Sequence, residues 1–470
     1  MVFSDLLFIY IFLAATLLLY FLARTITQRN CILIIASVFF YAWGEPFYVF
    51  LLILSSLINY VAGLLIDRYR KYGKLITGLT LLYDFGMLAV YKYAGFFVEN
   101  INSLFGISIP VPDIVMPIGI SFFTFQIVSY VIDCYWEKVK VQKNFFWLLM
   151  YISLFPQLIA GPIVRYETIE KEISNRRTTV ADFSDGLTRF IVGLAKKAVI
   201  ANSLSIVVDN LFLKRDGAFH VEESSIAGVW VGVIAFALYV YFDFSGYSDM
   251  AIGMGRIFGF HFDENFNYPF VSSSITEFWQ RWHISLGTFF RDYLLYVPIF
   301  GKRRKYASLF LVWFCTGFWH GASWNYIIWG LYFGIFIFIE TLLGKKRMKR
   351  IPSPIAHVYS LIVIIIGFGI FRFEDLSQLG YFFKGLVGAN GNAFLTDTSE
   401  TAILQNMFLI AFAAVISMPI LPAVKKFFSS RTSLAVVGSS LTVFTNVGLL
   451  ILSSIMLIDA TNNPFMYFRF

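Results

Sequence analysis

Two neighbouring segments of the chain hold the side chains best suited to chemistry. Residues 276–292 mix charged groups and one histidine, His283, with tryptophan and phenylalanine. Residues 316–325 place a second histidine, His320, in an apolar and aromatic run. Burial keeps an imidazole neutral, and a neutral histidine can take a proton from an attacking hydroxyl group and return it to a leaving group. We therefore interpret His283 and His320 as candidate general bases.

An alternative interpretation of both histidines is that they are buried imidazoles whose hydrogen bonds go to backbone carbonyl groups. The other three, His220, His261 and His357, fall in polar connectors or at the start of an apolar run, where local hydrogen bonding is a sufficient explanation. The sequence has no His-Glu-x-x-His motif and no cysteine cluster, so we expect no metal ion. Nor does it have the Gly-x-Ser-x-Gly motif of a serine nucleophile.

The composition determines the class of protein. Of the 470 residues, 58% are hydrophobic and only 14% are charged, and the mean hydropathy is +0.71. Many apolar windows of about twenty residues are long enough to cross a hydrocarbon core of about 30 Å. We therefore predict an all-α, polytopic membrane protein embedded in a lipid bilayer. The net charge of +8 lies in short clusters between apolar runs, which argues against nucleic-acid binding.

The positions of these basic clusters predict a topology. Residues 67–74, 137–143 and 345–350 are rich in Lys and Arg, whereas the loop at 374–400 is acidic. Because basic loops stay in the cytoplasm, both termini are expected outside. The regular spans expected are 6–22, 31–43, 47–66, 75–91, 117–136, 226–242, 355–371, 403–421 and 434–457.

The middle of the sequence is less regular. Two prolines inside the apolar run 145–164 predict a re-entrant element, and the amphipathic pattern of 182–197 predicts a helix along the cytoplasmic interface. Polar groups and turns are expected at 243–249, where Asp and Ser suggest helix capping and local packing rather than a nucleophile. The absence of internal repeats argues against a secondary transporter.

Four segments, 155–162, 241–249, 277–286 and 316–324, resemble the membrane-bound O-acyltransferases, especially the bacterial branch of alginate O-acetylation. The resemblance extends over nearly the whole chain. It implies one domain, residues 1–470, with about ten to twelve transmembrane helices and further re-entrant and interfacial helices around a funnel and tunnel. Its parts are the N-terminal spans 1–144, the catalytic core 145–340, the C-terminal spans 341–458 and an outer-side tail 459–470.

The resemblance also implies roles for individual residues. His320 matches the catalytic histidine of the family, and His283 matches a second polar position. The acyl donor is expected to be acetyl-CoA, as a co-substrate, with no bound cofactor. The residues expected to bind this donor or line the tunnel are Trp279, Arg281, Trp282, Arg291, Trp319 and Asn325. The basic residues 301–305 either bind donor phosphates or form an ordinary cytoplasmic loop.

The aromatic C-terminal segment, Phe-Met-Tyr-Phe-Arg-Phe at 465–470, should dock into the protein or bind a partner. It resembles the terminal tyrosine motif of extracellular acylation systems. That likeness suggests that Tyr467, deprotonated with the help of His320, accepts the acyl group and passes it to an outer-side partner. The alternative is an aromatic belt residue at the membrane surface.

Together, the resemblance implies a bacterial inner-membrane enzyme that moves an acetyl group from cytosolic acetyl-CoA to an extracytoplasmic polysaccharide. This acceptor would be an alginate-like exopolysaccharide or another cell-surface glycan. A secreted or anchored acyltransferase would complete delivery outside. Two alternatives stay open: a glycan or small-molecule transporter with the histidines along its path, and D-alanyl transfer to teichoic acid.

Overall fold

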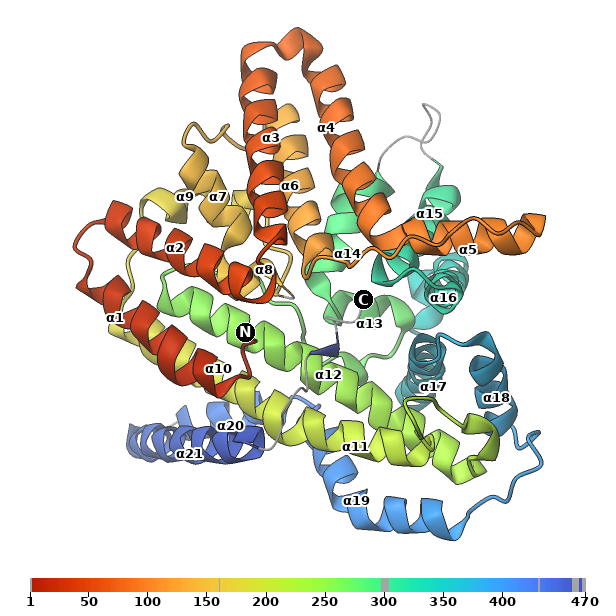
Figure 1. Ribbon diagram of the computed structural model, residues 1–470. Coiled ribbons are helices and arrows are strands. Elements are labelled where there is room, and N and C mark those ends of the chain that lie inside the picture. Colours follow the sequence, from red (N-terminus) through yellow and green to blue (C-terminus); the bar gives the residue numbers. More distant parts are fainter. Residues whose placement is uncertain (1, 160, 297–303, 430–431, 459–464, 467–470) are drawn as a thin grey trace. The chain divides into compact units, whose positions relative to one another are not determined.

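The computed structural model describes residues 2–159, 161–296, 304–429, 432–458 and 465–466 (Figure 1). Over these ranges the chain is helical and forms no strand; its single β feature there is an isolated bridge between Arg215 and Ala218. Nine helices of the described residues are long and apolar enough to cross a membrane, and two apolar helices are shorter, Phe8–Leu22 and Ile120–Tyr135. The predicted all-α membrane class is confirmed.

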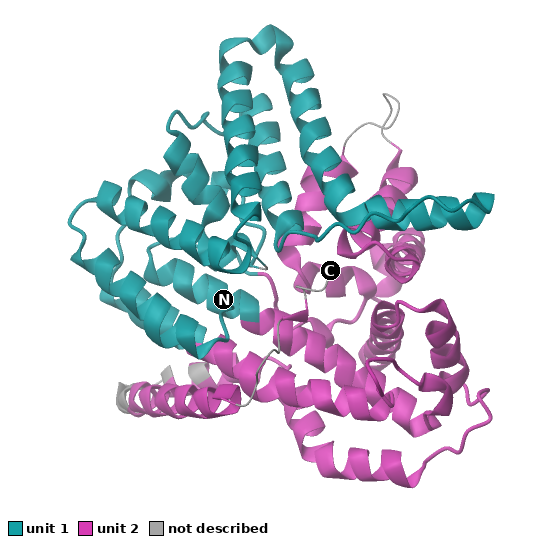
Figure 2. Cartoon of the chain, in the orientation of Figure 1, with its two compact units in different colours: residues 1–190, 247–264, 467–470 teal, residues 191–246, 265–466 magenta. Residues whose placement is uncertain are grey.

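The chain divides into two compact units (Figure 2). The described part of unit 1 lies within residues 1–190 and 247–264, and unit 2 comprises 191–246 and 265–466. The helices that begin in unit 1 are η1 (Phe8–Leu13), α1 (Ala14–Leu22), α2 (Ile26–Gly44), α3 (Tyr48–Arg68), η2 (Arg70–Tyr72), α4 (Gly73–Leu88), η3 (Ala89–Tyr93), α5 (Ala94–Phe105), α6 (Ile120–Tyr135), α7 (Phe145–Ser153), α8 (Phe155–Leu158), α9 (Tyr166–Ser174) and α10 (Val180–Ala195).

Unit 2 holds most of the second half of the chain. Its helices are η4 (Lys196–Ala201), α11 (Asn202–Leu211), η5 (Val221–Glu223), α12 (Ile226–Ile257, which continues into unit 1), η6 (Pro269–Val271), α13 (Ile275–Arg281), α14 (Ile284–Phe290), η7 (Arg291–Leu295), α15 (Lys305–His320), α16 (Trp324–Met348), α17 (Ser353–Arg372), α18 (Leu376–Leu386), α19 (Asp397–Ile416), α20 (Ile420–Ser429) and α21 (Thr432–Ile458).

Local sequence signals determine several helix ends in unit 1. Helix α2 starts with a capping box, in which Thr25 Oγ1 accepts the Gln28 N–H and Gln28 Oε1 accepts the Thr25 N–H, both at 3.2 Å. It ends at Gly44, ahead of Pro46, so the predicted break between two helices is confirmed. The expected interruption within 145–164 is also present, because α7 stops at Ser153 and the short α8 contains Pro156 near its start. A re-entrant path there stays a prediction.

The helix expected at 182–197 is the first half of a longer continuous helix, Val180–Leu211, which is a candidate span by length and composition. Its amphipathic pattern has an internal cause. In unit 1, Arg189 pairs with Asp249 at 2.9 Å and also with Glu264. Polar residues of this stretch therefore have ion-pair partners within the protein, and a position of this helix along the membrane interface stays a prediction.

The turns expected at 243–249 are absent from the structure, because helix α12 runs through the whole segment. Sequence inspection takes Asp and Ser as helix ends, since their side chains compete for backbone hydrogen bonds. Here the carboxylates of Asp243 and Asp249 bind Lys197 and Arg189 instead. The capping interpretation was therefore wrong for both aspartates.

Helices α15 and α16 of unit 2 pack closely, and two glycines make this possible (Figure 1). A Cβ atom at Gly317 would overlap the carbonyl oxygen of Tyr326, and one at Gly330 would overlap that of Trp313. Because α15 ends at His320, this contact also determines the position of the imidazole.

The substitution Gly330→Ala should therefore lower the melting temperature of the purified protein. Overpacking a tight contact costs about 1–3 kcal/mol, which exceeds the gain of about 1 kcal/mol from the higher helix propensity of alanine. Gly380→Ala in α18 is the matched control, because an added Cβ there meets no atom within 4 Å. Fluorescence-detected unfolding in detergent measures both; equal changes for the two variants would contradict the packing argument.

Candidate active site

His283 lies in the short connection between α13 and α14, where it is fully buried and has left-handed backbone angles (φ 45°, ψ 53°). Its partner is Asn265, a buried residue of the preceding connector. The side-chain oxygen of Asn265 lies 3.1 Å from His283 Nδ1, 2.8 Å from Ser285 Oγ and 3.2 Å from the Ser285 backbone nitrogen. One amide oxygen thus holds both the ring and the start of helix α14.

This arrangement determines the tautomer of His283. The backbone nitrogen of Ser285 can only donate, so the Asn265 atom that faces it has to be the oxygen. That oxygen can only accept, so His283 Nδ1 carries the hydrogen, and Nε2 of the neutral ring is the acceptor. His283 lies outside the candidate membrane spans, and burial lowers its pKa to about 3, so the ring is neutral near pH 7.

His320 is the last residue of α15 and is 2% exposed. Three aromatic rings contact its imidazole edge to face: Trp329 at 4.8 Å, Trp319 at 5.0 Å and Phe371 at 5.4 Å between ring centroids. The Trp319 ring also lies 5.9 Å from the His283 ring. The structure therefore brings both predicted histidines against one tryptophan, in an apolar, low-dielectric part of unit 2.

The other predicted tryptophans belong to the same aromatic cluster. Trp279 contacts Trp329 at 5.5 Å, and Trp329 in turn contacts His320. Trp282 contacts Phe266 at 5.0 Å, and Phe266 leads through Phe244 to His283, with 4.7 Å between the Phe244 and His283 rings. The rings of Trp279 and Trp282 thus belong to the aromatic surroundings of the two histidines.

Asn325 acts on the site through the backbone. Its buried amide group donates to the carbonyl oxygens of Ile370 at 3.3 Å and Phe371 at 3.2 Å. Phe371 is the ring that contacts His320, so Asn325 fixes the end of α17 beside the imidazole. This contact gives Asn325 a positioning role.

The predicted arginines have partners within the protein. Arg281 pairs with Glu277 at 3.0 Å and donates to the Asn267 carbonyl oxygen at 3.0 Å. Arg291 pairs with its neighbour Asp292 at 2.7 Å and is about half exposed. Of the basic residues 301–305, only the last two lie within the described residues, and Tyr467 lies outside them. Phosphate binding by these groups stays a prediction.

Two residues of the site were missed by sequence reasoning. The buried carboxylate of Glu340 in α16 accepts the N–H groups of Ile275 at 2.7 Å and Thr276 at 2.8 Å, so it caps helix α13, where a negative charge is stabilised. An acidic residue inside an apolar span is a signal that could have revealed it. Asn265 had no comparable signal, because it lies in a polar connector 18 residues before His283.

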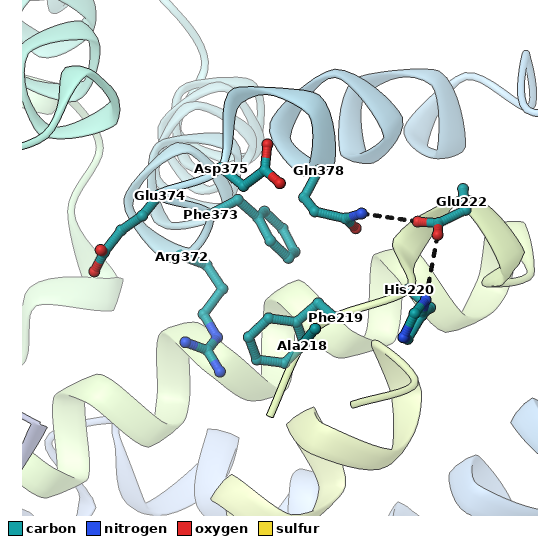
Figure 3. Close-up of a pocket in the computed structure, with 9 residues that line it drawn as sticks. All are labelled: Ala218, Phe219, His220, Glu222, Arg372, Phe373, Glu374, Asp375 and Gln378. Carbon is teal, nitrogen blue, oxygen red and sulfur yellow. Dashed lines mark hydrogen bonds and ion pairs between the residues drawn. The ribbon is translucent and has the colours of Figure 1, made fainter. Parts of the chain in front are cut away.

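A pocket of about 370 Å³ lies at the C-terminal end of α17, just after Phe371, and it is more open than the buried surroundings of the two histidines (Figure 3). Figure 3 shows the Arg372 side chain beside Phe219, with 4.1 Å from the guanidinium carbon to the ring centroid. Aromatic, acidic and amide groups line the pocket, which suits a ligand rich in hydroxyl groups. The lining residues are Ala218, Phe219, His220, Glu222, Arg372, Phe373, Glu374, Asp375 and Gln378.

Within this region, one ligand atom each from His220, Glu222 and Glu223 lies within 4.8 Å of the others. Ordinary pairing accounts for this cluster. His220 Nδ1 lies 3.4 Å from Glu222, Gln378 donates to Glu222 at 3.0 Å, and Glu223 pairs with Arg215 at 3.0 Å. These contacts fit the local hydrogen bonding expected for His220 and give no reason to assign a metal ion.

The neutral state of buried His283 predicts a specific pH dependence of stability. The unfolded chain binds a proton at this histidine below about pH 6.5, whereas the folded protein does so only near pH 3. Between these values the unfolding free energy should decrease by about 1.4 kcal/mol for each unit by which the pH is lowered, because of this residue. His283→Asn, which tolerates left-handed angles, should remove that contribution.

Unfolding at pH 5, 6 and 7 measures the effect, and the difference in slope between wild type and His283→Asn isolates it from other titrating groups. His261→Asn is the control, since this histidine is exposed and pairs with Glu172. Identical slopes for wild type and His283→Asn would show that the pKa of the ring is the same in the folded and unfolded protein.

Comparisons with known proteins agree with the resemblance. The model of the membrane-bound O-acyltransferase family matches residues 112–374, which include both histidines. A probable alginate O-acetylase of Pseudomonas aeruginosa is 40% identical over 389 residues, covering 80% of this chain and 73% of that protein. A peptidoglycan O-acetyltransferase of Helicobacter pylori is 32% identical over 446 residues (86% and 83%). A teichoic acid D-alanyltransferase of Bacillus subtilis is 30% identical over 284 residues (57% and 70%).

Proposed function

Because the chain belongs to the membrane-bound O-acyltransferase family, we propose that it transfers acetyl groups from cytosolic acetyl-CoA for the O-acetylation of an extracytoplasmic polysaccharide. It is a multi-pass membrane protein and an acyltransferase. The observation that carries the proposal is the placement of His283 and His320 against the shared ring of Trp319. The aromatic cluster around the two buried imidazoles, called the aromatic enclosure below, suits proton transfer without competing hydrolysis.

In the proposed reaction, His320 takes the proton of an acceptor hydroxyl as its oxygen attacks the thioester carbonyl carbon. A C–O bond forms, the C–S bond breaks, and the imidazolium returns the proton to the departing CoA thiolate. His283, with Nε2 as its acceptor atom, is a second hydrogen-bond acceptor within the enclosure. The surrounding rings of Trp279, Trp282 and Trp329 keep bulk water away from the thioester.

The relatives favour acetyl transfer to a glycan. The alginate and peptidoglycan enzymes are O-acetylating proteins by name, and both align over at least 80% of this chain. The teichoic acid D-alanyltransferase aligns over 57%, which supports D-alanyl transfer less well. The pocket at the end of α17 supports a hydroxyl-rich acceptor. Its lining includes Arg372, which follows Phe371 in the chain, and the ring of Phe371 contacts His320.

Delivery is proposed to pass through Tyr467. Its hydroxyl would accept the acetyl group first, and a secreted or anchored acyltransferase would then move the group to the polysaccharide. The basic clusters favour an outer position for the C-terminal segment in a bacterial inner membrane. Support comes from Phe465 and Met466, which immediately precede Tyr467 and are buried in unit 2.

His320→Ala should lower the transfer of labelled acetyl groups from acetyl-CoA by about 10²- to 10⁴-fold, since the general base is lost. The assay uses purified protein in lipid nanodiscs, with unfolding measured in parallel. His261→Ala serves as the control because this exposed residue lies in unit 1. A transporter with histidines along its path predicts no acetyl transfer by wild-type protein, and that result would exclude the enzyme.

Tyr467→Phe keeps the aromatic ring and removes only the hydroxyl group. We expect the C-terminal peptide to lose its acetyl label in mass spectrometry, and polysaccharide acetylation in cells to be abolished. Tyr381→Phe in α18 is a matched control on an exposed tyrosine of unit 2. Full polysaccharide acetylation by the Tyr467→Phe protein would refute the relay while leaving the role of His320 intact.

A further inference from the structure

Unit 2 contains a fully buried ion pair that the proposed reaction does not use. Lys197 in η4 and Asp243 in α12 are at most 1% exposed, and 2.6 Å separates Lys197 Nζ from Asp243 Oδ1. Removing two charges from water is costly, and apolar residues of similar size often stabilise a fold as well as such a pair does. Stability alone is therefore a weak reason for the pair.

The C-terminal segment binds to both members of this pair. The backbone N–H of Met466 donates to Asp243 Oδ2 at 3.0 Å, while Oδ1 of the same carboxylate accepts from Lys197. The ring of Phe465 lies 4.7 Å from Lys197 Nζ, within the range of a cation–π interaction. Phe465 and Met466 are 1% and 7% exposed, so this segment fills an enclosed site.

The backbone around the pair is built for close approach. Lys197 lies in the π-helical segment η4, a rare geometry that occurs frequently at functional sites. On the facing helix, a Cβ atom at Gly246 would lie 2.7 Å from the Gly193 carbonyl oxygen and 3.2 Å from the Lys197 nitrogen. Glycine at 246 therefore lets η4 and α12 come close enough for Lys197 to reach Asp243.

The site also adjoins the histidines along α12. Phe244 follows Asp243 in that helix, and its ring contacts His283 at 4.7 Å. The C-terminal segment is bound to Asp243, and the next residue of α12, Phe244, is one of the rings that contact His283. Met466 in turn immediately precedes Tyr467 in the sequence.

We propose that the Lys197–Asp243 pair is the binding site for the C-terminal segment of this same chain, and that the acyl relay through Tyr467 depends on this attachment. This inference rests on the relay of the proposed function and deepens it. Lys197 and Asp243 act as positioning residues: the carboxylate orients the Met466 backbone, and the ammonium group holds both the carboxylate and the Phe465 ring.

The test is carried out on the full chain in nanodiscs, with a photoreactive benzoylphenylalanine in place of Phe465. In the otherwise wild-type protein, irradiation should crosslink this residue to peptides of η4 or α12, identified by mass spectrometry. In the double variant Lys197→Met/Asp243→Leu, crosslinking should fall at least about tenfold, because neither the carboxylate nor the cation remains. The apolar pair preserves packing, so the fold is expected to survive, which unfolding measurements check.

Lys214→Met/Asp209→Leu is the matched control, since it removes a Lys–Asp pair of the same unit that is partly exposed. In the presence of labelled acetyl-CoA and with Phe465 intact, the Lys197/Asp243 double variant should also label its C-terminal peptide at least about tenfold less, as expected for a displaced reacting group. Its binding of labelled acetyl-CoA should stay unchanged, which a merely unfolded or distorted protein would not show.

Unchanged crosslinking in the Lys197/Asp243 double variant would overturn the binding site, even if Tyr467→Phe still abolishes acetylation. Lost crosslinking with unchanged labelling of the tail would overturn the positioning role. If the wild-type tail takes no label at all, the relay of the proposed function fails, and the positioning role with it, whereas crosslinking still reports whether the segment binds the ion pair.

Discussion

A polar or charged side chain that is buried among apolar helices needs a partner within the protein, because bulk water does not reach it there. This constraint accounts for the architecture around both histidines. Asn265 binds His283 and the start of α14, Glu340 binds the start of α13, and Asn325 binds the end of α17. Each partner comes from a different part of the chain, so satisfying these groups also determines how the helices of unit 2 assemble.

Aromatic rings, in addition to these hydrogen bonds, surround the two histidines. Trp319 contacts both imidazoles, and Trp329 and Phe371 contact His320. These rings provide no charge and no strong hydrogen-bond acceptor, so they keep both histidines in a low-dielectric environment, and burial of this kind lowers the pKa of His283. The glycines of α15 and α16 allow this cluster to close, since any side chain at 330 would push the two helices apart.

Much of this could be predicted from the sequence. The membrane class followed from the composition, and the break after α2 followed from Gly44 and Pro46. The histidines placed in two apolar, aromatic runs pointed to one common site, and the structure brings both rings against Trp319. The errors concern residues whose partners are distant in the sequence. Asp243 looked like a helix cap because its partner, Lys197, lies 46 residues earlier. Arg189 likewise pairs with Asp249 and Glu264, which lie 60 and 75 residues later. Periodicity describes one helix at a time, and it cannot reveal a partner supplied by another.

The backbone of His283 carries an evolutionary consequence. Its φ of 45° costs about 1–2 kcal/mol for an ordinary L-amino acid, whereas glycine and asparagine adopt such angles more easily. A lineage selected for heat resistance alone would therefore drift toward glycine or asparagine at this position and lose the imidazole. Histidine at this turn keeps the buried ring that Asn265 binds and Phe244 contacts, in a backbone conformation that glycine or asparagine would adopt more easily.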